Sequence, residues 1–264
     1  MSNNNVLYIN PVGTGEMNEK LDQYLNRFKG CDTKSVDVWN LRRGPHHLEY
    51  YYYDSLVAQD ILYLVKYAEN QGYAGTIIGC FYDPCLIVAR EICPHMVVVA
   101  PMEASIYLAA SLGHRFSILV SERKSIPEME NKLISYGLRD KLASFRNLDM
   151  GVLEFQKKPK LAEERMRREA KVAIEEDGAE VLILGCSMEF GFYEQLQDEF
   201  KVPVIDSVIA SLKYVEYLVE IRDKIGWMPS QIAQYKPPVL EEIREWNLET
   251  DYDMGDIWHK KKIK

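Results

Sequence analysis

The chain has 264 residues, of which 47% are hydrophobic and 27% charged, and its formal net charge is −8. This composition is typical of a globular protein that forms one large domain or two small ones. An acidic chain without a clustered basic face is not expected to bind nucleic acid. No apolar run reaches the roughly 18 residues of a membrane helix.

The five cysteines, at positions 31, 80, 85, 93 and 186, form an odd set without a Cys-x-x-Cys pair. This spacing argues against a disulfide framework and against a zinc site. No signal peptide is visible at the N-terminus, so we expect a cytoplasmic protein with reduced thiols. Cys31, Cys85 and Cys93 are interpreted as small core residues.

The first hundred residues alternate between strand and helix signals. In chain order they predict a strand at 6–10, a helix at 17–28, a strand at 35–40, a helix at 54–70, a strand at 76–80, a helix at 84–92 and a strand at 96–100. Asp83-Pro84 fits the N-cap and first-turn proline of the helix at 84–92.

The alternation continues beyond residue 100. The signals predict a helix at 102–112, a strand at 115–121, a helix at 127–136, a weak strand at 148–153, a helix at 159–176, a strand at 181–186, a short helix to 200, a strand at 202–206 and a helix at 207–224. Strands that alternate with helices indicate βαβ units and a mostly parallel sheet. The expected fold is α/β, with two similar lobes.

Two Gly-Cys pairs, Gly79-Cys80 and Gly185-Cys186, end apolar runs that precede helix signals. In open parallel sheets ligands bind outside the carboxyl ends of the strands, where helix N-termini stabilise a thiolate. Glycine before the thiol allows close approach of a ligand to the backbone. We therefore interpret Cys80 and Cys186, one from each lobe, as functional residues that close on a small molecule from opposite faces.

The sequence shows no phosphate loop, dinucleotide fingerprint or metal-ligand spacing. The only histidine cluster, His46-His47, lies in a turn-like segment and is interpreted as a surface loop. Two opposed acid/base groups without a cofactor suit the removal of a proton from one face of a carbon and its return on the other. The backbone N–H groups of Phe81 and Ser187 would stabilise the charge that develops on a neighbouring carbonyl.

At this point the motifs, taken together, resemble the hydantoin racemase branch of the aspartate/glutamate racemase superfamily, with allantoin racemase as a close relative. They are YINPVGTGEMN (8–18), GPHHLEYYYYDSL (44–56), GCFYDP (79–84), APMEASIYLAASLGHRFSILVS (100–121), LGCSMEF (184–190) and VPVIDSV (202–208). They occur in the family's order over residues 6–235.

The resemblance implies cofactor-independent racemisation with Cys80 and Cys186 as the proton-transfer groups. It implies that Asn10 lines the substrate pocket, although a strand-end cap is an equal reading for Asn10, and that Phe81 and Ser187 contact the substrate through backbone N–H groups. Glu103 is interpreted as a structural hydrogen-bonding residue.

The resemblance also implies an organisation in lobes. The first lobe is expected to span 1–99 plus 207–236 and the second 100–206, with the active site in the cleft between them and a C-terminal extension at 237–264. The expected partners are a small-molecule substrate and further copies of the chain in a homo-oligomer.

The sequence departs from the family pattern at both sites. Gly-Cys-Ser-Met-Glu (185–189) stands where the family usually has Gly-Cys-Ala-Gly-Met, and Tyr82, Pro84 and Cys85 replace smaller or more polar residues. A 5-substituted hydantoin is the expected substrate, and another carbonyl-flanked stereocentre is the alternative.

Three alternatives remain open. An arylmalonate decarboxylase-like enzyme is disfavoured because those relatives keep only the second cysteine. A maleate isomerase-like enzyme keeps both cysteines and is not excluded by them. A non-catalytic small-molecule binding protein on the same scaffold would need no acid/base pair.

Overall fold

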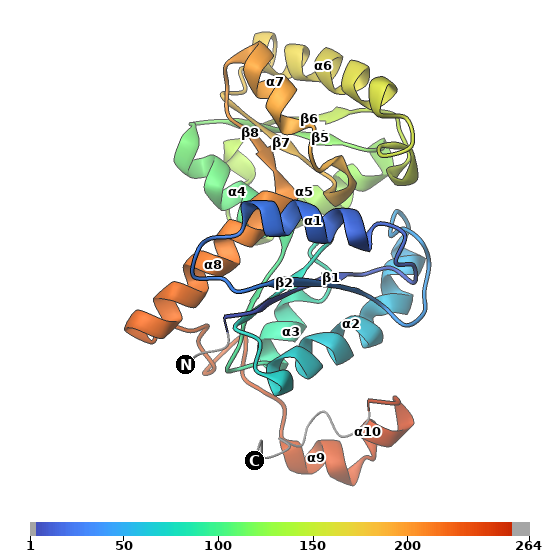
Figure 1. The fold of residues 1–264 in the computed structure, drawn as a ribbon, viewed down its shortest axis with the longest axis vertical. Helices are drawn as coiled ribbons and strands as arrows, with labels where there is room; N and C mark the ends of the chain where they lie inside the picture. Colours follow the sequence, from blue (N-terminus) through green and yellow to red (C-terminus); the bar gives the residue numbers. More distant parts are fainter. Residues whose placement is uncertain (1–3, 255–264) are drawn as a thin grey trace. The chain divides into compact units, whose positions relative to one another are not determined.

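The computed structural model describes residues 4–254, which divide into two compact units (Figure 1). One unit contains the chain up to Ile78, Pro84–Val99 and the chain from Leu212, and the other contains Gly79–Asp83 and Ala100–Ser211. Each unit has its own four-stranded parallel sheet, which confirms the predicted α/β fold with two similar lobes. The lobe boundaries that we expected from the sequence stay a prediction.

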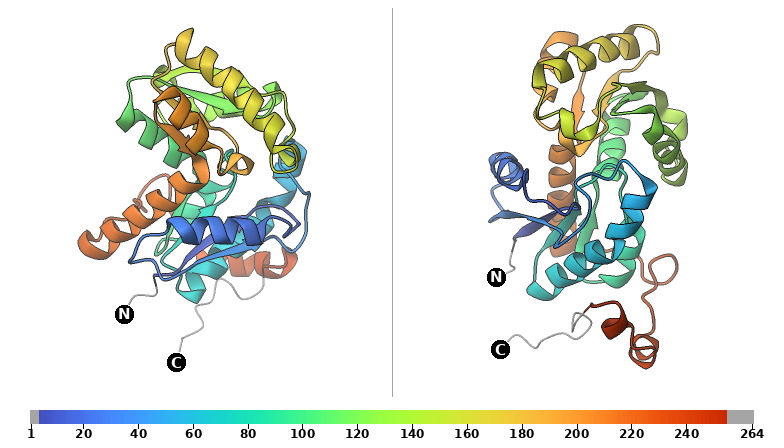
Figure 2. Two further views of the ribbon diagram at one scale, coloured as in Figure 1. Left: turned by 45° about the horizontal axis from the view of Figure 1, so that its top comes forward. Right: turned by 90° about the vertical axis from the view of Figure 1, so that its right-hand side faces the viewer.

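The sheet of the first unit has the order β2-β1-β3-β4. Its strands are β1 (Val6–Asn10), β2 (Val36–Asn40), β3 (Gly75–Ile78) and β4 (Val97–Val99). Helix α1 (Asn18–Phe28) lies on one face of this sheet, and α2 (Tyr51–Gln71) and α3 (Leu86–Ile92) lie on the other (Figures 1 and 2).

The sheet of the second unit has the corresponding order β6-β5-β7-β8. Its strands are β5 (Phe116–Val120), β6 (Leu142–Asn147), β7 (Val181–Leu184) and β8 (Val204–Asp206). Its α-helices are α4 (Pro101–Leu112), α5 (Ile126–Ser135), α6 (Pro159–Glu175) and α7 (Tyr193–Phe200). Four short 3₁₀ segments connect them: η1 (Arg123–Ser125), η2 (Arg139–Lys141), η3 (Val152–Glu154) and η4 (Ser187–Glu189).

The core of the second unit follows from its sequence pattern. All five residues of β5 and all four of β7 are buried, as expected for parallel strands covered on both faces. Ala162, Met166, Ala170 and Ala173 recur at helical spacing along α6, and all four belong to one buried cluster with Leu182 and Leu184 of β7. Helix α6 therefore covers one face of the sheet with mostly small side chains.

The C-terminal part of the chain contains helices separated by a non-helical segment at 226–239. Helix α8 (Ser207–Ile225) is followed by the short α9 (Leu240–Glu245) and α10 (Leu248–Asp251). The Asp206 carboxylate accepts hydrogen bonds from the backbone N–H groups of Val208 and Ile209, so it caps the start of α8. In the expected extension, Ile243 is buried, although the sequence shows no clear core pattern there.

Two predicted elements are misplaced. The strand predicted at 148–153 is wrong, because the strand is β6, just before it. Strand β6 is an edge strand with mostly half-buried side chains, so it lacks an apolar run. The backbone N–H of Leu148 donates to the carbonyl of Val120 at the end of β5, and the Leu148 side chain is fully buried. Helix α2 begins at Tyr51, three residues before the predicted start.

Within residues 4–254, no helix combines the length and the apolar character that crossing a bilayer requires.

We expect Gly185→Ala to lower the free energy of unfolding by about 3 kcal/mol. A Cβ atom at Gly185 would lie 2.4 Å from the Leu119 carbonyl oxygen and 2.7 Å from Cγ2 of Ile118, so the strand end would have to shift. Gly178→Ala is the control, because it adds a Cβ in open space at a φ of +73° and isolates the cost of left-handed backbone, about 1 kcal/mol. Urea unfolding measures both, and equal losses would contradict the expectation.

Candidate active site

The predicted site residues Asn10 and Cys80 lie at the carboxyl ends of the two central strands of the first sheet. From β1 and β3 the chain winds outward in opposite directions, which makes the boundary between these strands a topological switch point. Asn10 is the last residue of β1, and Cys80 lies two residues beyond Ile78, the last residue of β3. Ligands of open parallel sheets bind at such carboxyl ends.

Cys186 has the corresponding place in the second sheet. It lies two residues beyond Leu184, the last residue of β7, and β7 is paired with β5 across that sheet's switch point. β3 and β7 are each the third strand of their sheet in chain order. The repeated Gly-Cys pattern thus corresponds to the same structural position in two similar sheets.

Cys186 forms the N-cap of the 3₁₀ segment η4. Its Sγ accepts a hydrogen bond from the backbone N–H of Met188 at 3.4 Å. The side-chain amide of Gln156 donates to the carbonyls of Met188 (3.0 Å) and Phe190 (3.2 Å) and fixes this turn from a neighbouring segment. Ser187 lies directly after the thiol, and its Oγ is buried without a hydrogen-bond partner.

Cys80 is partly buried and opens a tight turn. The backbone N–H of Asp83 donates to the carbonyl of Cys80 at 3.0 Å, and Asp83 has a φ of +47°. Phe81, which was predicted to supply a backbone N–H to the substrate, has a buried side chain inside this turn. Residues 79–83 follow a strand of the first sheet but belong to the second unit.

The carboxylate of Asp83 caps α4 and not the helix that follows it in sequence. It is fully buried and accepts hydrogen bonds from the backbone N–H groups of Met102 and Glu103, both at 2.8 Å, and from the Tyr136 hydroxyl at 2.7 Å. Burial raises the pKa of Asp83 to about 7, although these three donors oppose the shift. The predicted local N-cap is therefore wrong, because α3 starts at Leu86 with Cys85 as its cap.

Tyr82 lies close to both predicted thiols. Its side chain is buried, and its hydroxyl is hydrogen-bonded with the Ser125 side chain at the end of η1. Burial raises the pKa of Tyr82, and the negative charges of Cys80 and Cys186 raise it further, so the phenol stays neutral. In the sequence, Tyr82 was visible only as a departure from the family pattern.

Glu189, at the end of η4, is a buried acid that the sequence did not assign a role. Its side chain is fully buried, and neither carboxyl oxygen accepts a hydrogen bond of good geometry. Burial raises the pKa of Glu189 well above its usual value; the backbone N–H groups of Cys186 and Gly185 oppose the shift, and the nearby charge of Asp206 adds to it. Asp206 accepts three backbone N–H bonds, from Gly191 and from the start of α8, whereas the buried carboxyl of Glu189 accepts none of good geometry.

The side chain of Asn10 belongs to a chain of amides at the carboxyl edge of the first sheet. Its Nδ2 donates to Oδ1 of Asn18 at 3.1 Å, and Nδ2 of Asn18 donates to Oδ1 of Asn40 at 2.9 Å. Asn10 and Asn40 end the paired strands β1 and β2. This network orients the amide of Asn10 and leaves its Oδ1 as an acceptor.

The remaining cysteines differ in their surroundings. Cys93 is buried, as predicted, and burial raises its pKa. Cys31 is exposed, so its interpretation as a core residue is wrong: it follows a helix end in a surface turn and not a buried strand. Cys85 is half-buried and has a φ of +58°.

Glu103, which was interpreted from the sequence as a structural residue, is buried in the first turn of α4.

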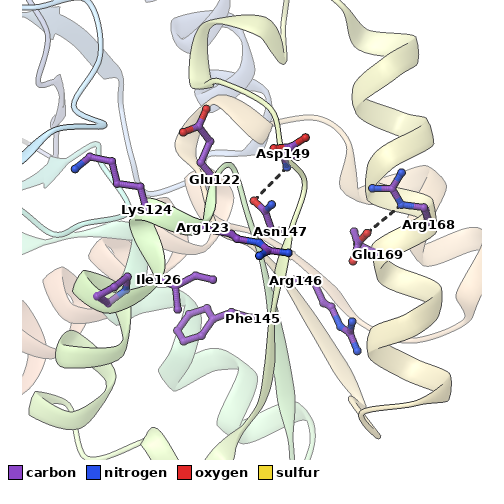
Figure 3. A pocket seen from close by; sticks show the side chains of 11 residues that line it. Glu122, Arg123, Lys124, Ile126, Phe145, Arg146, Asn147, Asp149, Arg168 and Glu169 are labelled. Carbon is purple, nitrogen blue, oxygen red and sulfur yellow. Dashed lines mark hydrogen bonds and ion pairs between the residues drawn. The ribbon is translucent and has the colours of Figure 1, made fainter.

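A polar pocket of about 910 Å³ lies elsewhere in the second unit (Figure 3). It is lined by the segment after β5, by the end of β6 and by α6, and none of the predicted site residues lines it. Three of its charged side chains form ion pairs: Arg168 binds Glu169 at 3.0 Å, and Arg146 binds Asp177, which lies outside the lining. Among residues 4–254 no group of three or more His, Cys, Asp or Glu side chains is arranged to hold a metal ion.

Comparison with known proteins connects this geometry to one family. The model of the Asp/Glu/Hydantoin racemase family matches residues 6–215. A hydantoin racemase of Pseudomonas sp. (strain NS671) is 34% identical over 234 residues, which cover 89% of this chain and 92% of the relative. A hydantoin racemase of Rhizobium meliloti is 30% identical and covers 88% of this chain and 94% of the relative.

Solved structures of other proteins superpose on this chain over most of its length. The allantoin racemase from Klebsiella pneumoniae superposes with a TM-score of 0.82 at 29% identity, covering 89% of this chain and 94% of that one. A variant of arylmalonate decarboxylase superposes with a TM-score of 0.62 at 16% identity, covering 81% of this chain and 92% of that one. At that identity the second likeness concerns the fold alone.

We expect Asp83→Ala to lower the free energy of unfolding by about 3 kcal/mol, because it leaves two amides of α4 and the Tyr136 hydroxyl without their buried acceptor. Asp83→Asn keeps one acceptor oxygen and should lose less. Chemical denaturation of both variants at one pH tests this, and an Asp83→Ala variant as stable as the wild type would contradict the capping role.

We expect Glu189→Gln to match the wild type in stability only below about pH 4 and to exceed it as the pH rises. The folded state raises the pKa of Glu189, so its contribution is fully present below the unfolded value and is lost as the pH rises through the folded value. Glutamine has nearly the same shape and never ionises. The unfolding free energies of both proteins between about pH 4 and 9 measure this, and a difference that does not change with pH would disprove it.

Proposed function

Because the chain belongs to the Asp/Glu/Hydantoin racemase family, we propose that it racemises 5-substituted hydantoins, or a compound with a similar carbonyl-flanked stereocentre, by proton transfer between Cys80 and Cys186. The family and the relatives make the protein an isomerase of the racemase type. The substrate and the residues that act on it are the proposed part.

The observation that carries the proposal is the position of the two thiols. Each follows the third strand of its sheet at a switch point, and Tyr82 lies close to both. In one direction the Cys80 thiolate takes the proton from the stereocentre, and the Cys186 thiol donates its own proton to the opposite face. The reverse reaction exchanges the roles, so no net proton is gained or lost. The chemistry needs no cofactor, because the thiols supply both base and acid.

The intermediate carbanion needs its charge delocalised onto the adjacent carbonyl. We assign the stabilising donors to the backbone N–H groups of Phe81 and Ser187, which directly follow the two thiols in the chain. The N–H of Met188 donates to Cys186 Sγ and favours its thiolate form. Asn10, whose amide is oriented by Asn18, is assigned to the substrate-contacting surface at the end of β1.

The first test is incubation of the protein with single enantiomers of 5-substituted hydantoins and of allantoin in heavy water. Loss of optical rotation together with deuterium at the stereocentre supports the proposal, and the fastest substrate identifies the class. Decarboxylation of an arylmalonate, or conversion of maleate to fumarate, would replace it with the corresponding alternative. Tight binding of these compounds without turnover would indicate a binding protein.

We expect Cys80→Ser and Cys186→Ser each to lower racemisation by about 10²–10⁴-fold, the usual contribution of a general acid or base. Each single variant keeps one thiol, so any remaining deuterium exchange should be confined to one enantiomer, and that enantiomer should differ between the two variants. Cys31→Ser, at an exposed thiol, is the control. Either variant racemising at the wild-type rate would refute the two-thiol assignment.

A cytoplasmic location, a small-molecule substrate and assembly into a homo-oligomer complete the proposal. Sedimentation of the purified protein over a range of concentrations tests the assembly.

A further inference from the structure

Tyr82 occupies a fixed position in the turn that begins at Cys80. It lies two residues beyond the thiol, in a turn closed by the hydrogen bond from the Asp83 N–H to the Cys80 carbonyl. Only 9% of the Tyr82 surface is exposed. A buried tyrosine ring usually removes 150–250 Å² from solvent, so this ring fills a large volume next to the Cys80 turn.

The hydroxyl of Tyr82 is hydrogen-bonded to a residue that lies at the same sheet edge as the second thiol. Its partner Ser125 follows β5, Cys186 follows β7, and these strands are paired with Leu119 opposite Leu184. Ser125 and Cys186 therefore both lie beyond the carboxyl edge of the second sheet. The electrostatic interaction of Tyr82 with Cys80 and Cys186 agrees with a position near both thiols.

The ring has little freedom to move away. The Ser125 hydroxyl also donates to the Glu122 carbonyl, so the group that holds Tyr82 is itself fixed by the backbone. Swinging the ring outward would break the hydrogen bond with Ser125 and expose buried apolar surface, both of which are unfavourable.

We propose that Tyr82 determines substrate specificity: its ring occupies space beside the two thiols and restricts the stereocentre to small substituents. The inference rests on the proposed function and narrows its substrate class to hydantoins, or related compounds, with a short side chain. Tyr82 is also one of the positions at which the sequence departs from the family pattern of smaller or more polar residues. One methylene in a tight pocket changes kcat/KM by roughly 10–200-fold, so a whole ring has a large effect.

The test compares 5-methylhydantoin with 5-benzylhydantoin for the wild type, Tyr82→Ala and Tyr82→Phe, with kcat/KM for racemisation as the readout. We expect the wild type to prefer the methyl compound by roughly 10-fold or more, and Tyr82→Ala to lower this preference by at least roughly 10-fold. Tyr82→Phe keeps the ring and should keep the preference. Tyr82→Leu removes less volume and should give an intermediate ratio, which keeps the test decisive if Tyr82→Ala does not fold.

The outcomes separate this inference from the proposed function. Racemisation by the wild type, with the same methyl-to-benzyl ratio in folded Tyr82→Ala or Tyr82→Leu, overturns the role of Tyr82 and leaves the racemase intact. A ratio that changes equally in Tyr82→Phe also overturns it, because the hydroxyl would then matter more than the ring. A wild type that exchanges no deuterium into either compound overturns the hydantoin assignment, and this inference falls with it.

Discussion

A carboxylate that caps a helix remote in sequence constrains this structure more than any other polar contact of its candidate site. Asp83 accepts two backbone N–H bonds from the start of α4 and a third hydrogen bond from Tyr136. Its backbone closes the turn that starts at Cys80. The first predicted thiol is therefore placed by the N-terminus of a helix that begins twenty-one residues later, because Asp83 satisfies donors that would otherwise be buried without partners. The same contacts hold Asp83 in its left-handed backbone conformation.

The second thiol reaches a corresponding position by different contacts. Gly185 lies so close to Leu119 that no side chain fits, which sets the distance of the Cys186 turn from β5. Gln156 binds two carbonyls of that turn, and Asp206 binds the N–H of Gly191 just beyond it. The glycine before Cys186 was interpreted from the sequence as room for a ligand, whereas the contacts explain it by the packing of two strands. The two Gly-Cys pairs thus share a place in the topology without sharing the contacts that hold them.

The elements that the sequence predicted well are those with a periodic apolar signal. The buried runs of β5 and β7 and the long α6 fall close to their predicted bounds, because burial on both faces or on one helix face leaves a clear pattern. Strand β6 was missed because an edge strand needs few apolar residues, and Leu148 after it carries the apolar signal instead. At the candidate site the sequence showed which residue types are present, but it did not show their hydrogen-bond partners in the fold. Asp83 looked like a local cap because its true partners are distant in sequence, and nothing in the sequence around Glu189 indicates that its carboxyl is fully buried.

The capping contact also allows opening of the Cys80 turn to be measured at the start of α4. The amide protons of Met102 and Glu103 are bonded to Asp83 and not to another part of α4, so they exchange with solvent only when that contact opens. Hydrogen exchange at these two amides therefore follows the opening of the turn that carries the first thiol, without a label on the cysteine. A ligand that binds against Cys80 and stabilises the closed turn would slow both amides together, which turns the start of α4 into an internal reporter of site occupancy.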